Sequence, residues 1–197
     1  MKIAEKHGIL LIVDEVQSGM GRTGRMFACE HFGLDVDIIT IAKGIASGLP
    51  LGVTCARADV MTWPPGAHAS TFGGNPVSGA AALATIKLLK DGLVKNADVV
   101  GAHMLDRLRA LKDKHTIIGD VRGKGLMIGV ELVRDRVTKE RATTERNDLV
   151  QAMFKRGVLI LGAGRNAIRF APPLVLTKDQ ADTIVKLFDE CLTALKK

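Results

Sequence analysis

The sequence has little of several features that mark particular classes of protein. It contains three cysteines, Cys29, Cys55 and Cys191, an odd number without CxxC spacing, so neither a disulfide framework nor a zinc site is predicted. No apolar run reaches the length of about eighteen residues that a membrane-spanning helix needs. The N-terminal residues MKIAEKHG lack the charged-then-apolar pattern of a signal peptide. We therefore expect a cytoplasmic protein with no membrane partner and no bound metal.

Aromatic residues are also scarce, at 4% of the chain, which leaves few platforms for stacking nucleic-acid bases. The formal charge of +7 by itself favours phosphate binding. However, the basic residues are spread along the chain and mixed with acids, as in residues 134–146 (RDRVTKERATTER), where five bases accompany three acids. We interpret the excess charge as a solvated surface, and we expect no nucleic-acid partner.

Two apolar runs near the N-terminus end in ionisable residues. With 197 residues and 47% hydrophobic residues, the chain is long and apolar enough for one or two packed domains. The runs Ile9–Val13 and Asp37–Ala42 have the length and β-branched content of buried strands, and they are followed by Asp14 and Lys43. Ligands of open α/β sheets bind at the carboxyl ends of the strands. If these strands are neighbours, the acid and the amine face one pocket.

This pair of side chains has a specific chemical use. A lysine amine that loses its proton forms a Schiff base with pyridoxal phosphate, and that cofactor also needs a carboxylate at its ring nitrogen. An ionised Asp14 beside the ring would keep the ring protonated and able to accept electrons, while Lys43 would carry the cofactor. The spacing alone leaves an alternative open, in which Asp14 caps a turn and Lys43 is a solvated residue before Gly44.

Three motifs in this chain resemble those of one known family. The segments DEVQSGMGRTG, IAKGIASGLPLG and STFGGNP (70–76) resemble, in order and spacing, the signature of the class III pyridoxal-phosphate aminotransferases. The resemblance implies an α/β protein of fold-type I, with part of a mostly parallel sheet from the large domain followed by a small C-terminal α/β domain. We place the first at residues 1–92 and the second, with its connecting helix, at 93–197. Family members are longer, and this chain is similar to their C-terminal half.

The resemblance also implies roles for individual residues. Asp14 would pair with the pyridine nitrogen, Val16 would pack on one face of the ring, and Gln17 would lie near the ring hydroxyl. Lys43 would bind the cofactor covalently and then transfer a proton during catalysis. Thr71 would reach the phosphate of the cofactor in the neighbouring subunit, which implies a homodimer. Strand alternation turns Glu15, next to Asp14, the other way, so we expect it to be structural.

Two further sites follow from this reading. Thr71 lies beside Gly73–Gly74, just ahead of a helix that should begin near Pro76, and a hydroxyl with backbone N–H donors suits a phosphate there. Arg169 resembles the family's carboxylate-binding arginine, whose guanidinium grips amino-acid and 2-oxo acid carboxylates. Without the resemblance, a salt-bridged surface arginine is the alternative. His68 has no partner placed by the sequence, so we interpret it as an ordinary loop histidine.

The expected reaction is the transfer of an amino group from an ω-amino acid, such as 4-aminobutyrate, to 2-oxoglutarate. Acetylornithine or ornithine transamination is an alternative that the sequence does not separate from it. A third reading, from another class, is a non-catalytic truncated fragment or subunit that needs the missing N-terminal half, since the family's main phosphate loop and stacking ring are absent. Such a chain would expose a sheet edge and an apolar face, which predicts self-association.

The remaining elements are predicted from hydrophobic spacing and from turn residues. Residues 62–72 contain a Pro-Pro pair and read as a loop, and residues 134–144 read as a mobile loop. The predicted helices are Met1–Gly8, Pro76–Lys90, Leu93–Lys114, Glu145–Arg156 and one beginning at Thr177, and the predicted strands are Leu51–Cys55, Ile117–Arg122, Leu126–Leu132, Val158–Leu161 and Ala167–Phe170.

Overall fold

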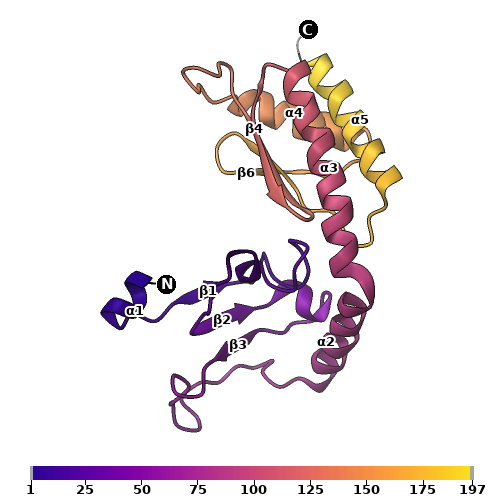
Figure 1. Ribbon diagram of the computed structural model, residues 1–197. Helices are drawn as coiled ribbons and strands as arrows, with labels where there is room; N and C mark the ends of the chain where they lie inside the picture. The colour runs from indigo at the N-terminus through magenta and orange to yellow at the C-terminus, as the bar shows by residue number, and fades with distance from the viewer. Residues whose placement is uncertain (1, 196–197) are drawn as a thin grey trace. The chain divides into compact units, whose positions relative to one another are not determined.

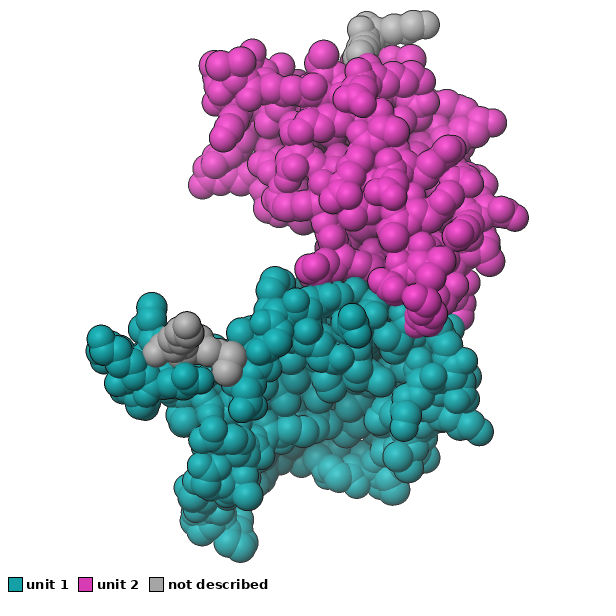
Figure 2. All heavy atoms as spheres, viewed as in Figure 1, with its two compact units in different colours: residues 1–94 teal, residues 95–197 magenta. Residues whose placement is uncertain are grey.

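The computed structural model describes residues 2–195. The outermost positions of both expected domains, Met1 and Lys196–Lys197, lie outside the described residues. The chain forms two compact units, residues 1–94 and 95–197, which Figure 2 shows in different colours. Each unit has its own β-sheet.

Unit 1 is built on a three-stranded sheet in the order β1-β2-β3 (Figure 1). Its strands are β1 (Ile12–Asp14), β2 (Ile38–Ile41) and β3 (Val53–Ala56). β2 runs parallel to β1 and antiparallel to β3, so the sheet is mixed. The sequence IVD, IITI and VTCA of these strands is rich in β-branched residues, which suit a pleated, half-buried surface.

The first strand is shorter than the sequence predicts. Helix α1 (Lys2–His7) ends at Gly8, which has a positive φ of 62°, and the Ile9 N–H donates to Ala4 O at 2.9 Å. Leu11 donates its N–H to a carboxylate oxygen of Asp37 at 2.7 Å instead of joining the ladder. The prediction that the strand begins at Ile9 was therefore wrong, because the helix end and a side chain take the backbone donors before Ile12.

Short helical segments complete unit 1. They are the 3-10 turns η1 (Ala28–Phe32) and η2 (Lys43–Ala46), the helix α2 (Pro76–Leu88) and the π-helical turn η3 (Leu89–Leu93). η3 contains Gly92 at φ 146°, a conformation that glycine adopts freely. Few apolar side chains are buried among the described residues of this unit: Met20, Cys29, Ile41, Ile45, Ala46, Ala82 and Leu89.

Unit 2 combines a four-stranded antiparallel sheet with three helices. The sheet order is β4-β5-β7-β6, and neighbouring strands run antiparallel throughout. In chain order the elements are α3 (Val94–Lys114), β4 (Ile118–Lys124), β5 (Met127–Leu132), α4 (Thr143–Lys155), β6 (Leu161–Ala163), β7 (Ala167–Phe170) and α5 (Lys178–Ala194). α3 and α5 lie side by side (Figure 1), and ion pairs from Arg107 to Asp182 and from Lys114 to Asp189 link the two helices.

A continuous core lies between one face of this sheet and the helices. Alternate residues of β5, Ile128, Val130 and Leu132, are buried, as period-two alternation requires of a strand with one covered face. From α5, the fully buried Phe188 meets Phe170 of β7 edge to face, with ring centroids 5.2 Å apart. These contacts join helices and sheet into one hydrophobic cluster.

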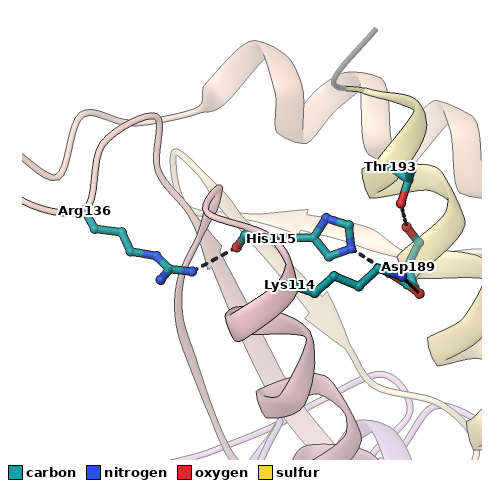
Figure 3. Close-up of polar contacts among 5 residues, drawn as sticks. All are labelled: Lys114, His115, Arg136, Asp189 and Thr193. Carbon is teal, nitrogen blue, oxygen red and sulfur yellow. Dashed lines mark hydrogen bonds and ion pairs between the residues drawn. The ribbon is translucent and has the colours of Figure 1, made fainter.

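A polar cluster fixes the C-terminal end of α3 (Figure 3). The buried His115 ring contacts a carboxylate oxygen of Asp189 on α5 at 2.5 Å, and Lys114 binds the other oxygen at 2.6 Å. The Arg136 guanidinium donates to the carbonyl oxygens of His115, at 2.9 Å, and of Thr116, at 3.1 Å. The same guanidinium donates to the carbonyl oxygen of Lys112, so a cation at the end of α3 satisfies a carbonyl in the last turn of the helix.

One predicted strand in unit 2 needs correction. The predicted strand Val158–Leu161 lies too early, because the paired residues are Leu161–Ala163, opposite Ala167–Arg169 of β7. The loop at residues 134–144 has a bridge between Val133 and Arg141 at its base and ion pairs from Arg134 to two glutamates, and the mobility expected of it stays a prediction. Within residues 2–195, no helix combines the length and the apolar character needed to cross a membrane.

Candidate active site

The register of β1 and β2 brings Asp14 and Lys43 to the same end of neighbouring strands. Asp14 is the last residue of β1 and pairs with Thr40 of β2. Lys43 follows the last residue of β2, Ile41, by two positions. Because the two strands are parallel, their carboxyl ends share one edge of the sheet, which is where α/β sheets bind ligands. The condition for a common site, that the two strands be neighbours, is therefore met.

Lys43 has an unusual backbone conformation for a residue with a side chain. Its φ is 48°, in the left-handed region, and it begins the 3-10 turn η2 directly after Ala42 in extended conformation. Such a conformation costs on the order of 1 kcal/mol for a non-glycine residue and is often found at functional positions. The side chain of Lys43 is exposed. The amine is thus carried on a sharp turn at the end of a strand rather than within a helix.

The carboxylate of Asp14 is held from two sides although it is exposed. The Val16 N–H donates to Oδ1 at 2.9 Å, and the hydroxyl of Thr40 donates to the same oxygen at 3.3 Å. Asp14 therefore does bond the turn that follows its strand, as the alternative reading proposed, and it does so while bound to the neighbouring strand as well. The sequence pattern did not reveal Thr40, since only the strand register shows what lies opposite Asp14.

Glu15 confirms the prediction from strand alternation. Its side chain is fully buried, and its carboxylate accepts the Ser18 hydroxyl at 2.5 Å and the Cys29 N–H at 2.7 Å. Burial, with a further contribution from Glu15, raises the pKa of the Cys29 thiol. Glu15 thereby fastens the glycine-rich loop after β1 to the body of unit 1. Val16, half-buried, and Gln17, exposed, lie on the turn between Asp14 and this loop.

Thr71 lies in the loop before α2 and is exposed. The expected role of the helix N-terminus in phosphate binding does not hold in full. Asn75 caps α2, and its side-chain oxygen accepts the N–H groups of Val77 at 2.9 Å and Ser78 at 3.3 Å. These two donors are therefore already used. A phosphate here would depend on the Thr71 hydroxyl and on the loop around Gly74, whose φ is 73°.

Arg169 lies in unit 2, on β7 between β5 and β6. Its Nε atom is buried, and neither this atom nor the rest of the guanidinium has an ion-pair or hydrogen-bond partner within the described part of the chain. Within residues 2–195, Arg169 is half-buried and forms no salt bridge, which does not fit the alternative of a salt-bridged surface arginine. The side chain borders a groove of about 210 Å³, together with Met104, Val158, Leu159, Ile160, Leu161, Phe170, Ala171, Pro172, Pro173 and Ile184.

An arginine with a buried, unpaired Nε–H beside an apolar groove suits an anionic ligand with an apolar body. Asp14, Lys43 and Thr71 belong to unit 1, whereas Arg169 belongs to unit 2.

His68, the remaining candidate, stacks on Trp63 with ring centroids 6.1 Å apart and planes 13° apart. That contact fits the ordinary loop histidine expected from the sequence.

Comparisons with known proteins agree on one family. The family model described as Aminotransferase class-III matches residues 1–192. A leucine/methionine racemase from Thermococcus litoralis is 48% identical over 183 residues, which are 92% of this chain and 41% of the relative. An acetylornithine aminotransferase from Caldanaerobacter subterraneus is 37% identical over 196 residues, covering 99% of this chain and 48% of the relative. The chain therefore spans less than half the length of these relatives.

The fold agrees as well. An amine transaminase from an uncultivated Pseudomonas species, solved in a form with bound pyridoxal phosphate, matches with a TM-score of 0.91 and 36% identity. The match covers 98% of this chain and 46% of that one. The fold-type I class expected from the sequence is confirmed, and the pyridoxal-phosphate cofactor is confirmed at the level of the family. The chain belongs to the class III aminotransferase family.

Proposed function

We propose that unit 1 binds pyridoxal phosphate through Asp14 and Lys43. The observation that supports this most directly is the parallel register that places both residues at the carboxyl ends of adjacent strands. When bound, this cofactor withdraws electrons from the substrate carbon that carries the amino group. Asp14 would hold the ring nitrogen through a charged hydrogen bond, and the Lys43 amine would attach the cofactor and move the substrate proton. Val16 would cover one ring face, and Gln17 would lie at the ring hydroxyl.

Thr71 would contribute from a second subunit. Its hydroxyl lies in an exposed loop, and the helix behind that loop has two of its N–H groups capped by Asn75. A phosphate reached by Thr71 would therefore be bound by the hydroxyl and by loop donors. We propose, as the family resemblance implies, a homodimer in which each copy supplies Thr71 to the cofactor of its partner. The cytoplasmic location and the dimer both stay predictions.

The proposed reaction is transfer of an amino group from an ω-amino acid such as 4-aminobutyrate to 2-oxoglutarate, with Arg169 binding the carboxylate. The unpaired guanidinium at the apolar groove supports this assignment of Arg169. Acetylornithine or ornithine is an equally supported donor, given the 37% identity to an acetylornithine aminotransferase. An assay that offers each amino donor together with 2-oxoglutarate and measures the glutamate formed separates these substrates.

Racemisation of an amino acid is a second candidate, and the 48% identity to a leucine/methionine racemase favours it. In this reaction Lys43 would remove a proton from one face of the substrate carbon, a proton would return to the opposite face, and the amino group would stay on the substrate. The two candidates differ in their need for an oxo acid. Formation of D-leucine from L-leucine without 2-oxoglutarate would indicate a racemase, whereas glutamate that forms only with 2-oxoglutarate would indicate a transaminase.

A third candidate is a non-catalytic fragment or subunit. It is supported by the share of the relatives that the chain spans, 41% and 48%, and by apolar side chains of unit 1 that are largely exposed, such as Ile12 at 60% and Leu83 at 71%. Such a chain would associate with itself or with a partner. A monodisperse monomer with a cooperative thermal transition would contradict this reading.

The test of the cofactor site uses the purified chain with added pyridoxal phosphate. After borohydride reduction, peptide mass mapping should place the adduct on Lys43, and Lys43→Ala should abolish it together with the near-visible absorbance band. Lys90→Ala, which removes another exposed lysine of unit 1, serves as the matched control and should leave both signals intact. Adducts scattered over many lysines would contradict the proposed site.

A further inference from the structure

The polar residues of the unit 1 sheet lie in a single row. The strands read IVD, IITI and VTCA, in which Asp14, Thr40 and Thr54 are the residues with oxygen-bearing side chains. The register pairs Asp14 with Thr40 and Thr40 with Thr54. Paired residues of neighbouring strands point to the same face, so the three side chains lie next to one another on an otherwise apolar sheet.

Thr40 forms hydrogen bonds with Asp14 and with the residue that follows it, Glu15. Its hydroxyl donates to Oδ1 of Asp14 at 3.3 Å, and its carbonyl oxygen accepts the Glu15 N–H at 2.9 Å. The backbone bond fixes how far β1 extends along β2, and thus which residue faces Asp14. Because Glu15 is itself buried and hydrogen-bonded, this register has little freedom to slip.

Two torsions place the Asp14 carboxylate: one about Cα–Cβ, which has three staggered rotamers, and a soft one about the terminal bond to the sp² carbon. Two donors that converge on one oxygen remove that freedom. The Val16 N–H and the Thr40 hydroxyl both reach Oδ1, from the following turn and from the next strand. With Oδ1 held in this way, the direction of Oδ2 is fixed as well.

We infer that Thr40 is a positioning residue for Asp14, which directs Oδ2 towards the ring nitrogen of bound pyridoxal phosphate. The inference rests on the cofactor site proposed above. Lys43 follows Thr40 by three residues on the same strand and turn, so a single segment orients the acid and carries the amine. A valine at this position would keep the shape and the β-branching of threonine and would lose only the hydroxyl.

Three variants test this role. Thr40→Val removes the donor, and Thr40→Ser keeps it while changing the packing. Thr54→Val is the matched control, because it removes the other hydroxyl of the row from β3, one strand further from Asp14. Circular dichroism and thermal transitions of the four proteins first establish that each variant folds like the unaltered chain.

The first measurement needs no cofactor. Three-bond NMR coupling constants of the Asp14 β-protons report its side-chain rotamer. We expect one dominant rotamer in the unaltered chain, in Thr40→Ser and in Thr54→Val, and rotamer averaging in Thr40→Val. A single rotamer retained in Thr40→Val would overturn the positioning role, whether or not the chain binds the cofactor.

The second measurement uses pyridoxal phosphate labelled with ¹⁵N in its ring. In Thr40→Val the ring-nitrogen signal should move towards the unprotonated value and the affinity for the cofactor should fall about fivefold, the usual effect of one lost hydrogen bond. Thr40→Ser should restore both, and Thr54→Val should change neither. An unaltered chain with no Lys43 adduct would refute the cofactor site instead, which separates the two failures.

Discussion

The two units differ in how fully their large apolar side chains are buried. Unit 2 has four paired strands and a continuous core that includes Met104, Leu108 and Phe188, all fully buried. Unit 1 has three short strands, and large apolar side chains such as Ile12 and Leu83 are mostly exposed. Yet unit 1 carries the acid, the amine and the hydroxyl proposed to bind the cofactor. Packing within unit 2 accounts for its buried apolar residues. The residues at the strand ends of unit 1 are accounted for by the proposed cofactor site instead.

The largest expected difference between the units lies in the cost of removing an apolar side chain. Phe188→Ala should lower the free energy of unfolding by about 3–5 kcal/mol, because it leaves a cavity beside Phe170 in the core of unit 2. Leu83→Ala in α2 of unit 1 should change it by less than about 0.5 kcal/mol, since the leucine is 71% exposed. Urea unfolding followed by circular dichroism measures both. Equal effects would remove the distinction between the units.

Two glycines within helices should respond to alanine with opposite sign. At Gly101 of α3, a Cβ would lie 2.1 Å from the carbonyl carbon of Gly125 in the turn between β4 and β5, so Gly101→Ala should destabilise the chain by about 3 kcal/mol. At Gly79 of α2, nothing lies within 4 Å of the added atom. Gly79→Ala should therefore stabilise by about 0.5–1 kcal/mol through helix propensity.

Thermal unfolding of these two variants gives the comparison directly. A lower midpoint for Gly101→Ala and a higher one for Gly79→Ala would show that the close approach of α3 to the β4–β5 turn, rather than helix propensity, governs the first position. If Gly101→Ala were neutral, the contact with Gly125 would not be a determinant of the unit 2 fold.

Sequence reasoning located most elements of the fold because their signals are local. The helix α5 begins after Thr177, where a capping box with Gln180 fixes its start. The strand Ala167–Phe170 was predicted with its observed bounds. The errors came where distant residues decide the outcome. The N–H of Leu11 bonds the Asp37 carboxylate rather than a strand, and pairing with β7 moves β6 to Leu161–Ala163. Neither contact is visible in hydrophobic spacing.

The candidate site divides in the same way. The positions of Asp14 and Lys43 at strand ends followed from pattern, and the parallel register then placed them at one edge. The participation of Thr40 could not be predicted, because it depends on which residue of β2 lies opposite Asp14. Likewise, Asn75 was not recognised as the cap that occupies the first donors of α2, although an Asn-Pro pair at a helix start is a known signal.

A smaller effect than those of Phe188→Ala and Gly101→Ala is expected in the polar cluster that links α3 to α5. Burial alone would raise the pKa of the Asp189 carboxyl, but the hydrogen bonds from His115 and Lys114 outweigh it and lower that pKa. A folded pKa below the unfolded value means that the stabilisation is complete above the unfolded pKa of about 4. It is then lost as the pH falls through the folded pKa. Asp189→Asn should lower the free energy of unfolding at neutral pH by about 1–2 kcal/mol.

The control for this prediction is Asp98→Asn, which removes an ion pair with Lys95 that is exposed on α3. An exposed pair of this kind contributes little, so the variant should be within about 0.5 kcal/mol of the unaltered chain. Urea unfolding at pH 7 and pH 3 separates the two carboxylates, because the gap between the unaltered chain and Asp189→Asn should narrow at the lower pH. A gap that is independent of pH would mean that packing around Asp189, rather than its charge, holds α5 against the end of α3.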